Sequence, residues 1–232
     1  RYYGFSFHDD YEVFDEILHY RDWDFCQIQY NYMDTQEQAG DKGYALAESL
    51  GVPLVIMEPI KGGSLANFSE DINDRFHKMD PDRSVASYAL RWVGSHPNVK
   101  VILSGMSTMD QVEDNLKTFQ DFSPLSEAEE KEIESIVTEL RSRVQNGCTG
   151  CRYCMPCPAG VNIPGNFKVW NNYHMYRTYD HVKWSWEKEL KEEEKAKNCI
   201  KCGKCETLCP QKLSIRDNLV QVQKDLDERI FK

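Results

Sequence analysis

Apolar and polar residues follow two different rhythms along the first half of the chain. Short apolar runs, bounded by Gly, Pro or polar residues, have the length of β-strands. Between them lie stretches whose apolar residues recur at helical spacing. Four strand and helix units in succession predict an α/β fold with a parallel sheet and right-handed crossovers. The predicted strands are 2–7, 25–30, 53–57 and 99–103, and the predicted helices are 11–18, 41–50, 85–93 and 110–119.

One further helix closes this region. Ser126-x-x-Glu129 is a capping box, and an apolar stripe runs from Ile133 to Val144. Asn146-Gly147 then ends the helix directly before a cysteine, so we predict two domains, 1–145 and 146–232. The first carries 13 Lys and Arg against 27 Asp and Glu, and the second 15 against 11. Such a division favours different contacts for the two domains, although ordinary solvated surfaces would also give it.

Eight of the nine cysteines form two runs in the last third of the chain, each ending in Cys-Pro. Three cysteines at intervals of three place three thiolates on one tight turn, which suits three corners of a 4Fe-4S cubane. The fourth cysteine of each run, by the rule for two-cluster ferredoxins, binds the cluster of the other run. The sequence therefore predicts two 4Fe-4S clusters, one held by Cys148, Cys151, Cys154 and Cys209, the other by Cys199, Cys202, Cys205 and Cys157.

Structural zinc and disulfides are the alternatives for these cysteines. Zinc sites usually pair two ligands per knuckle with a longer spacer before the next pair, which the evenly packed runs fit poorly. Disulfides need an oxidising compartment, and the residues after Arg1 do not resemble a secretory signal. The lone Cys26 is expected to be a buried apolar side chain.

The segment between the two runs reads largely as helix. Residues 167–174 carry an aromatic stripe, and a charged helix is predicted from about Lys183 to Lys197, with ion pairs from Glu187 to Lys191 and from Glu193 to Lys197. We therefore expect a mainly helical ferredoxin-like domain. Its tryptophans are expected to help shield the clusters, and they are Trp170, Trp184 and Trp186.

Composition excludes several classes of partner. No apolar run approaches the length of a membrane span, so no membrane is expected and the location is expected to be cytoplasmic. A net charge of -10 argues against nucleic acid. Because the cysteine domain is mildly basic, an acidic soluble electron carrier such as a ferredoxin or flavodoxin would be attracted to it.

The four strand and helix units resemble the C-terminal half of the aldo/keto reductase barrel. Gly4-Phe5-Ser6 resembles the fifth strand of the family, Gln27 to Asn31 the sixth, and Met57-Glu58-Pro59 with Gly62-Gly63 the seventh. Ser104-Gly105-Met106-Ser107 resembles the strand that binds the nicotinamide cofactor NAD(P), and cysteine runs of this kind end an iron-sulfur branch of the family. The resemblance implies the C-terminal half of a (β/α)8 TIM barrel, followed by the ferredoxin-like domain.

Cofactor-binding roles carry over residue by residue from this resemblance. Ser6 and Gln27 would bind the nicotinamide carboxamide, Gly105 and Ser107 the phosphates, and Gln111, Asp114 and Asn115 the adenine. No catalytic residue is assigned, because the catalytic Asp, Tyr, Lys and His of the family belong to its first four strands. A closed barrel takes about 250 residues, so the chain is expected to be the C-terminal part of a longer protein and to be inactive alone.

Two functions fit these observations. The first is an oxidoreductase that resembles aldo/keto reductases, acts on a small carbonyl substrate and exchanges electrons through its clusters. The second is an electron-transfer or partner-binding module with a catalytically silent barrel.

Overall fold

A computed structural model describes residues 1–177 and 179–230 of the chain. It divides into two compact units, Arg1–Val137 and Thr138–Lys232, within helix α6 (Glu127–Ser142). In the described residues no helix is long and apolar enough to cross a membrane.

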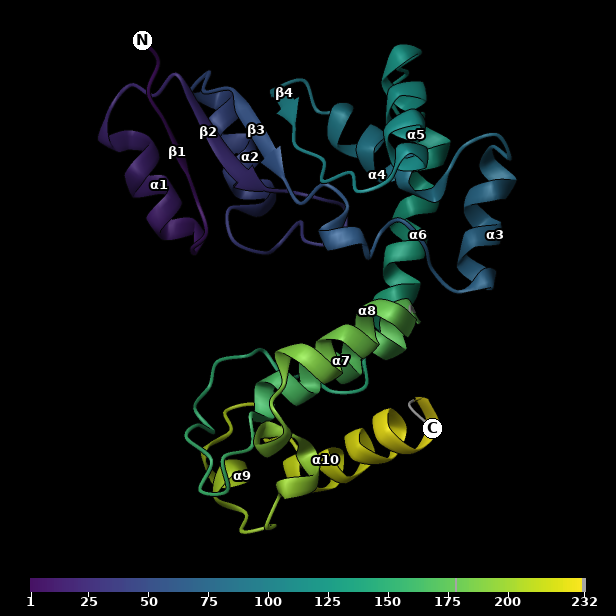
Figure 1. The fold of residues 1–232 in the computed structure, drawn as a ribbon. Coiled ribbons are helices and arrows are strands. Elements are labelled where there is room, and N and C mark those ends of the chain that lie inside the picture. The colour runs from purple at the N-terminus through teal and green to yellow at the C-terminus, as the bar shows by residue number, and fades with distance from the viewer. Residues whose placement is uncertain (178, 231–232) are drawn as a thin grey trace. The chain divides into compact units, whose positions relative to one another are not determined.

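The first unit is built on one sheet of four strands in the order β1-β2-β3-β4 (Figure 1). The strands are Gly4–Ser6, Phe25–Gln29, Leu54–Met57 and Val99–Ile102. Every neighbouring pair is parallel. The α/β fold with a parallel sheet is therefore confirmed, and β1 and β4 are its two edge strands.

Helices follow or precede each strand, and four of the five lie at the predicted places. They are α1 (Tyr11–Tyr20), α2 (Gly40–Ser49), α3 (Glu70–Met79), α4 (Val85–Gly94) and α5 (Met109–Gln120), with a short 3-10 turn at Lys61–Gly63. Gly51 follows α2 with a φ of 68°, a backbone region that favours glycine, and so allows the chain to turn into β3.

In the two central strands, one face of the sheet is fully buried against these helices. Cys26 and Ile28 of β2 and Leu54 and Ile56 of β3 pack with side chains of α1, α2 and α4. Burial raises the pKa of the Cys26 thiol to about 12, so Cys26 is the buried apolar side chain that was predicted. The residues between them in the strands, such as Gln27 and Met57, are only partly buried. The second face of the sheet is thus less covered than the first.

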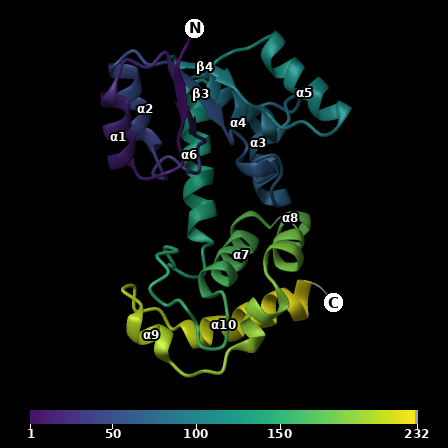
Figure 2. The same cartoon turned by 60° about the vertical axis from the view of Figure 1, so that its left-hand side comes forward.

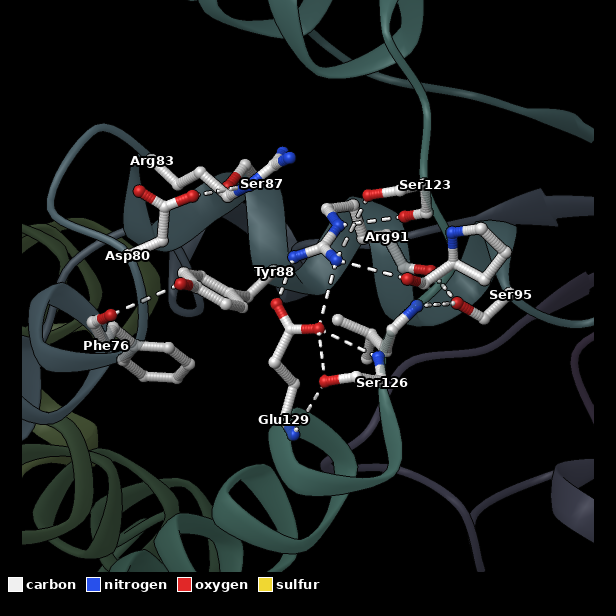
Figure 3. Close-up of polar contacts among 12 residues, drawn as sticks. Phe76, Asp80, Arg83, Ser87, Tyr88, Arg91, Ser95, Ser123, Ser126 and Glu129 are labelled. Atoms are coloured by element: carbon white, nitrogen blue, oxygen red, sulfur yellow. Dashed lines mark hydrogen bonds and ion pairs between the residues drawn. The ribbon is translucent and has the colours of Figure 1, made fainter.

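The start of α6 is fixed by a buried ion pair (Figure 3). The Arg91 guanidinium donates to both carboxylate oxygens of Glu129, at 2.6 and 3.1 Å, and to the carbonyl oxygens of Ser123 and Pro124. Glu129 also accepts hydrogen bonds from the backbone N–H and the hydroxyl of Ser126, both at 2.8 Å, which confirms the capping box. This network ties α4 to the N-terminus of α6.

The second unit contains helices, turns and loops, and no strand among its described residues, as predicted for a mainly helical domain (Figure 2). The two longest helices, α7 (Ile163–Tyr176) and α10 (Ile215–Gln223), pack against each other. Shorter elements are α8 (Tyr179–Trp184), α9 (Lys204–Leu208), the π-helical segments Ser185–Glu189 and Lys224–Ile230, and the 3-10 turns Glu192–Glu194 and Ala196–Asn198.

The predicted charged helix from Lys183 to Lys197 is wrong in its second half. Leu190 adopts an extended backbone, with φ -96° and ψ 118°, which carries its side chain into the core. The buried Asn166 then holds the non-helical backbone, because its amide donates to the Glu194 carbonyl and accepts from the Ala196 N–H, both at 2.8 Å. Tertiary packing therefore outweighs the helix propensity of this segment.

The ion pairs predicted for that helix are wrong as well. Lys197 pairs with Glu192 at 2.5 Å instead of Glu193, and Lys195 pairs with the same carboxylate. Glu187 lies 4.0 Å from Lys183 instead of pairing with Lys191. The helical spacing on which the prediction rested does not exist after Glu189.

Candidate functional site

The structure brings the eight cysteines of the two runs into two groups of four. One cavity in the second unit is lined by Cys148, Cys151, Cys154 and Cys209. A second cavity is lined by Cys157, Cys199, Cys202 and Cys205, and also by Cys154. Each cavity therefore combines three cysteines of one run with the fourth cysteine of the other.

The two cavities share a wall. Cys154 and the buried Ile163, at the start of α7, line both of them. Apolar side chains complete the linings, with Phe167, Leu213 and Ile215 in the first cavity and Ile200 and Leu219 in the second. The thiols thus face two neighbouring spaces with mostly apolar walls.

An internal repeat places the fourth cysteines. Cys157-Pro158 and Cys209-Pro210 each begin a turn in which the N–H three residues later donates to the cysteine carbonyl, at 3.0 and 3.1 Å. Both turns contain a left-handed residue, Gly160 or Lys212, and lead directly into a helix, α7 or α10. Two equivalent units, each a turn followed by a helix, therefore place the fourth cysteine of one run at the cavity that the other run forms.

The loops that carry the other cysteines have matching backbones. In each run the residues just before and just after the second cysteine have positive φ: Gly150 and Arg152 in the first, Lys201 and Gly203 in the second. These left-handed residues bend the loop tightly around its three thiols. The nearby Gly150 N–H lowers the pKa of the Cys148 thiol.

Burial is the main influence on several of these thiols. It raises the pKa of Cys148 and Cys154, and the nearby thiols of Cys151 and Cys209 raise both further. Burial, followed by the charge of Glu206, raises the pKa of Cys205. Binding of an iron-sulfur cluster would therefore have to displace the protons, as thiolate ligation requires.

The donor set fits a 4Fe-4S cluster in each cavity, because each lining supplies at least the four thiols that such a cluster requires. Sulfur is the only strong ligand that either lining offers. No group of three or more Cys, His, Asp or Glu side chains in the described residues is arranged to hold a single metal ion.

None of the three tryptophans predicted to shield the clusters lines either cavity. Trp184 is 55% exposed. Trp170 and Trp186 are buried, but their indole N–H groups donate to Asp225 and Asp227, and neither lines a cavity. Phe167 and aliphatic side chains such as Ile163, Ile215 and Leu219 line the cavities in their place.

In the first unit, Ser6, the last residue of β1, lies beside Gln27 in the middle of β2. The Gln27 amide donates to the Ser6 hydroxyl at 3.3 Å and lies 3.6 Å from the Met57 sulfur. The carboxyl ends of parallel strands carry the ligand-binding residues of α/β barrels. Ser6 lies at such an end, and the binding of the nicotinamide carboxamide by Ser6 and Gln27 stays a prediction.

A wide cleft lies between the loop after β3 and the start of α5. Gly105, Gln111, Asp114 and Asn115 line it, with Gly62 and Gly63 on the other side. Ser107 is not part of the lining, but its N–H donates to the Gln111 side chain at 2.7 Å. Four of the five predicted phosphate and adenine residues thus surround one cleft.

The polar side chains of this cleft also have structural partners. Gln111 caps α5 through the Ser107 and Thr108 N–H groups, Asp114 accepts from the Ser84 hydroxyl at 2.6 Å, and Asn115 donates to Ser104 at 2.9 Å. These contacts hold the side chains in place before any ligand arrives.

Sequence reasoning missed a buried polar cluster beside the cleft. Lys61 donates to both oxygens of Asp34, at 2.5 and 2.6 Å, and Asp34 also accepts from Gln29 and Asn31. The Asn31 amide donates in turn to the carbonyl of Glu58. This cluster joins the loops after β2 and β3. The only signal in the sequence is the position of these residues just after two strands.

Each half of the chain matches the model of a known protein family. Residues 1–138 match the model of the Aldo/keto reductase family, and residues 147–213 match that of the 4Fe-4S dicluster domain. No curated protein matches the chain significantly.

Solved structures resemble the first unit. An aldo-keto reductase from Bacillus halodurans is 22% identical in its holo form, with 58% of this chain and 49% of that chain covered and a TM-score of 0.46. A thermostable aldo-keto reductase in complex with the inhibitor epalrestat is 21% identical, with 58% and 48% covered and a TM-score of 0.44. The chain spans about half the length of these structures.

Proposed function

Because the chain belongs to the aldo/keto reductase family and carries a 4Fe-4S dicluster domain, we propose that it is part of an oxidoreductase that links carbonyl chemistry to one-electron transfer. The observation that carries this proposal is the grouping of eight cysteines into two adjacent four-thiol cavities on the same chain as the reductase sheet.

Two clusters are proposed, with crossed ligands. Cys148, Cys151, Cys154 and Cys209 would hold the first, and Cys157, Cys199, Cys202 and Cys205 the second, and each cluster would supply one-electron transfer when bound. Cys154 lines the second cavity too, but its run supplies three thiols to the first. Free thiolates and clusters persist in a reducing compartment, so we place the protein in the cytoplasm.

A nicotinamide cofactor is proposed for the first unit, where it would supply hydride when bound. Ser6 and Gln27 would orient its carboxamide, and Gly105 would allow the backbone to approach its phosphates, because no atom lies where a side chain would begin. Asn115 and Asp114 would receive the adenine end of the cleft. The substrate would be a small carbonyl compound.

The chain alone lacks two parts of this site. Carbonyl reduction needs a proton donor close to the hydride acceptor, and we assign none among the described residues. Four strands also leave one face of the sheet half-buried and both edges unpaired. We therefore propose that four further strands complete the barrel in the active protein, and that these 232 residues alone do not reduce carbonyl compounds.

The stoichiometry of electrons explains why two clusters would be useful. Hydride transfer moves two electrons at once, whereas each cluster moves one. Two adjacent clusters with a shared wall can together accept or supply the pair.

An anaerobic titration of the intact protein with NADPH tests this proposal. The visible absorption of the clusters should bleach as NADPH is oxidised, and Gln27→Ala should weaken this response without altering the iron content. If dithionite bleached the clusters but neither NADPH nor NADH did, the proposed electron transfer between nicotinamide and clusters would be contradicted. An electron-transfer module with a catalytically silent barrel would then be favoured.

A further inference from the structure

The second cysteine of each run stands apart from the other six. Cys151 and Cys202 are the two exposed cysteines of the eight. Each is adjacent to an exposed cation with a left-handed backbone, Arg152 with a φ of 64° and Lys201 with a φ of 56°. Exposed sulfur ligands and cations therefore occur together at both loops.

These cations occupy positions where glycine would cost less. Arg152 corresponds to Gly203 in the other loop, and Lys201 corresponds to Gly150, and all four have positive φ. A side chain in this backbone region is strained, whereas glycine is not. Strained positions of this kind often lie at functional sites, so Arg152 and Lys201 are candidates for a functional role.

The charge at both cavities has one sign although the whole chain is acidic. Among the described residues that line the cavities, the charged ones are Arg152, Lys201 and Arg216. Arg216 pairs with Glu206 at 2.7 Å. In the described part of the chain no ion pair is formed by Arg152 or Lys201, so their charges face solvent.

A large apolar side chain lies beside each cation. Tyr153 follows Arg152 and is 67% exposed, and Ile200 precedes Lys201 and is 66% exposed. We call Cys151, Arg152 and Tyr153 the first mouth, and Ile200, Lys201 and Cys202 the second mouth. An exposed apolar residue next to an exposed cation is a composition that suits a transient protein interface.

We propose that the two mouths are docking surfaces for a small acidic protein that carries one electron. The cations attract its acidic surface, the apolar side chains make the close contact, and the exposed cysteines bring the cluster nearest to it. One electron passes from the reduced carrier to a cluster, or in the reverse direction, so the donor is oxidised and the acceptor reduced by one unit with no bond broken. This inference rests on the proposed clusters.

Calorimetric titration of the cluster-loaded protein with an acidic plant-type ferredoxin tests the proposal. The double variant Arg152→Glu, Lys201→Glu should weaken binding about tenfold or more, and raising the ionic strength beyond about 0.15 M should weaken wild-type binding. The basic carrier cytochrome c should not bind. Iron and sulfide are measured first in each variant, so a loss of clusters, which concerns the proposed function, is distinguished from a loss of docking.

Two further variants separate charge from folding. Arg152→Gly, Lys201→Gly removes both charges in a backbone that glycine prefers, and it should also weaken ferredoxin binding. Lys168→Glu changes an equally exposed cation on α7 that lines neither cavity and should leave binding within about twofold. Equal ferredoxin affinity in wild type and in the glycine variant, with clusters intact, would overturn the proposal.

Discussion

Cys157 and Cys209 are exchanged between the two cysteine runs: each lines the cavity that the other run forms. Each of them begins a Cys-Pro turn of the same kind, shortly before a helix. The exchange predicts which cluster each residue serves. Cys157→Ser should alter the electron paramagnetic resonance spectrum of the reduced protein in the same way as Cys202→Ser, and Cys209→Ser in the same way as Cys151→Ser.

The matched pairs make this prediction independent of any assignment of the spectra. If Cys157→Ser instead reproduced the spectrum of Cys151→Ser, each run would hold its own cluster and the exchange would be wrong.

Strain in the cysteine loops predicts two stabilising substitutions. Arg152→Gly and Lys201→Gly remove a side chain from a left-handed residue, and each should raise the free energy of unfolding of the cluster-loaded second unit by about 1 kcal/mol. Gly150→Ala and Gly203→Ala, at the equivalent positions, should lower it. Chemical denaturation under anaerobic conditions measures all four, and a stability loss in both glycine variants would contradict the strain.

The pair of the buried Arg91 with the half-buried Glu129 predicts a loss of stability in the first unit. Arg91→Ala leaves the Glu129 carboxylate with only Ser126 as a partner, and it should cost about 2 kcal/mol. Arg83→Ala, which removes a more exposed pair with Asp80, should cost less than about 1 kcal/mol. Thermal denaturation of both variants measures the two losses of stability, and equal losses would contradict the larger contribution of the Arg91 network.

The same pair predicts the direction of a pH dependence. Burial raises the pKa of Glu129, but the hydrogen bonds from Arg91 and Ser126 outweigh it and hold the pKa at about 2, below its ordinary value of 4.5. A carboxylate with a lowered pKa stabilises the fold above the unfolded value and loses that effect as the pH falls. The stability of wild type should therefore fall from about pH 4.5 towards pH 2, and Glu129→Gln should show a smaller fall over that range. If the stability of wild type and of Glu129→Gln fell in parallel with pH, a stabilising role of the ionised Glu129 carboxylate would be ruled out.

The open sheet predicts how the 232 residues behave when expressed alone. Unpaired edges at β1 and β4 promote association with other strands. We expect the isolated chain to aggregate or dimerise and to show no carbonyl reductase activity, and we expect an added N-terminal half-barrel to restore a soluble species. Size-exclusion chromatography with an aldehyde assay measures both. A soluble monomer that reduces aldehydes with NADPH would contradict the requirement for further strands.

The sheet was predictable because each strand and helix has its own local pattern. Cys26, Ile28, Leu54 and Ile56 are apolar at alternate positions and form the buried face. The helix predicted after Lys183 was wrong for the opposite reason. The structure of that segment depends on contacts that Leu190 and Asn166 make with residues far away in the sequence. Helical spacing of charges contains no information about such contacts.

The cysteine ligand groups were predictable from spacing alone, but their surroundings were not. Residues Val161-Asn162-Ile163 and Leu213-Ser214-Ile215 follow the two Cys-Pro pairs, and this repeat could have revealed the paired helices. The left-handed backbones of Arg152 and Lys201 have no signal in residue type, because cations seldom occupy such positions. Only the fold shows them.

Chemical analysis of the anaerobically purified protein tests the central claim most directly. Two clusters in the two four-thiol cavities predict a brown protein with close to eight irons and eight acid-labile sulfides per chain, from the four of each that a 4Fe-4S cluster contains. Absorption in the visible region should be bleached by dithionite. Stoichiometric zinc without sulfide would contradict the account.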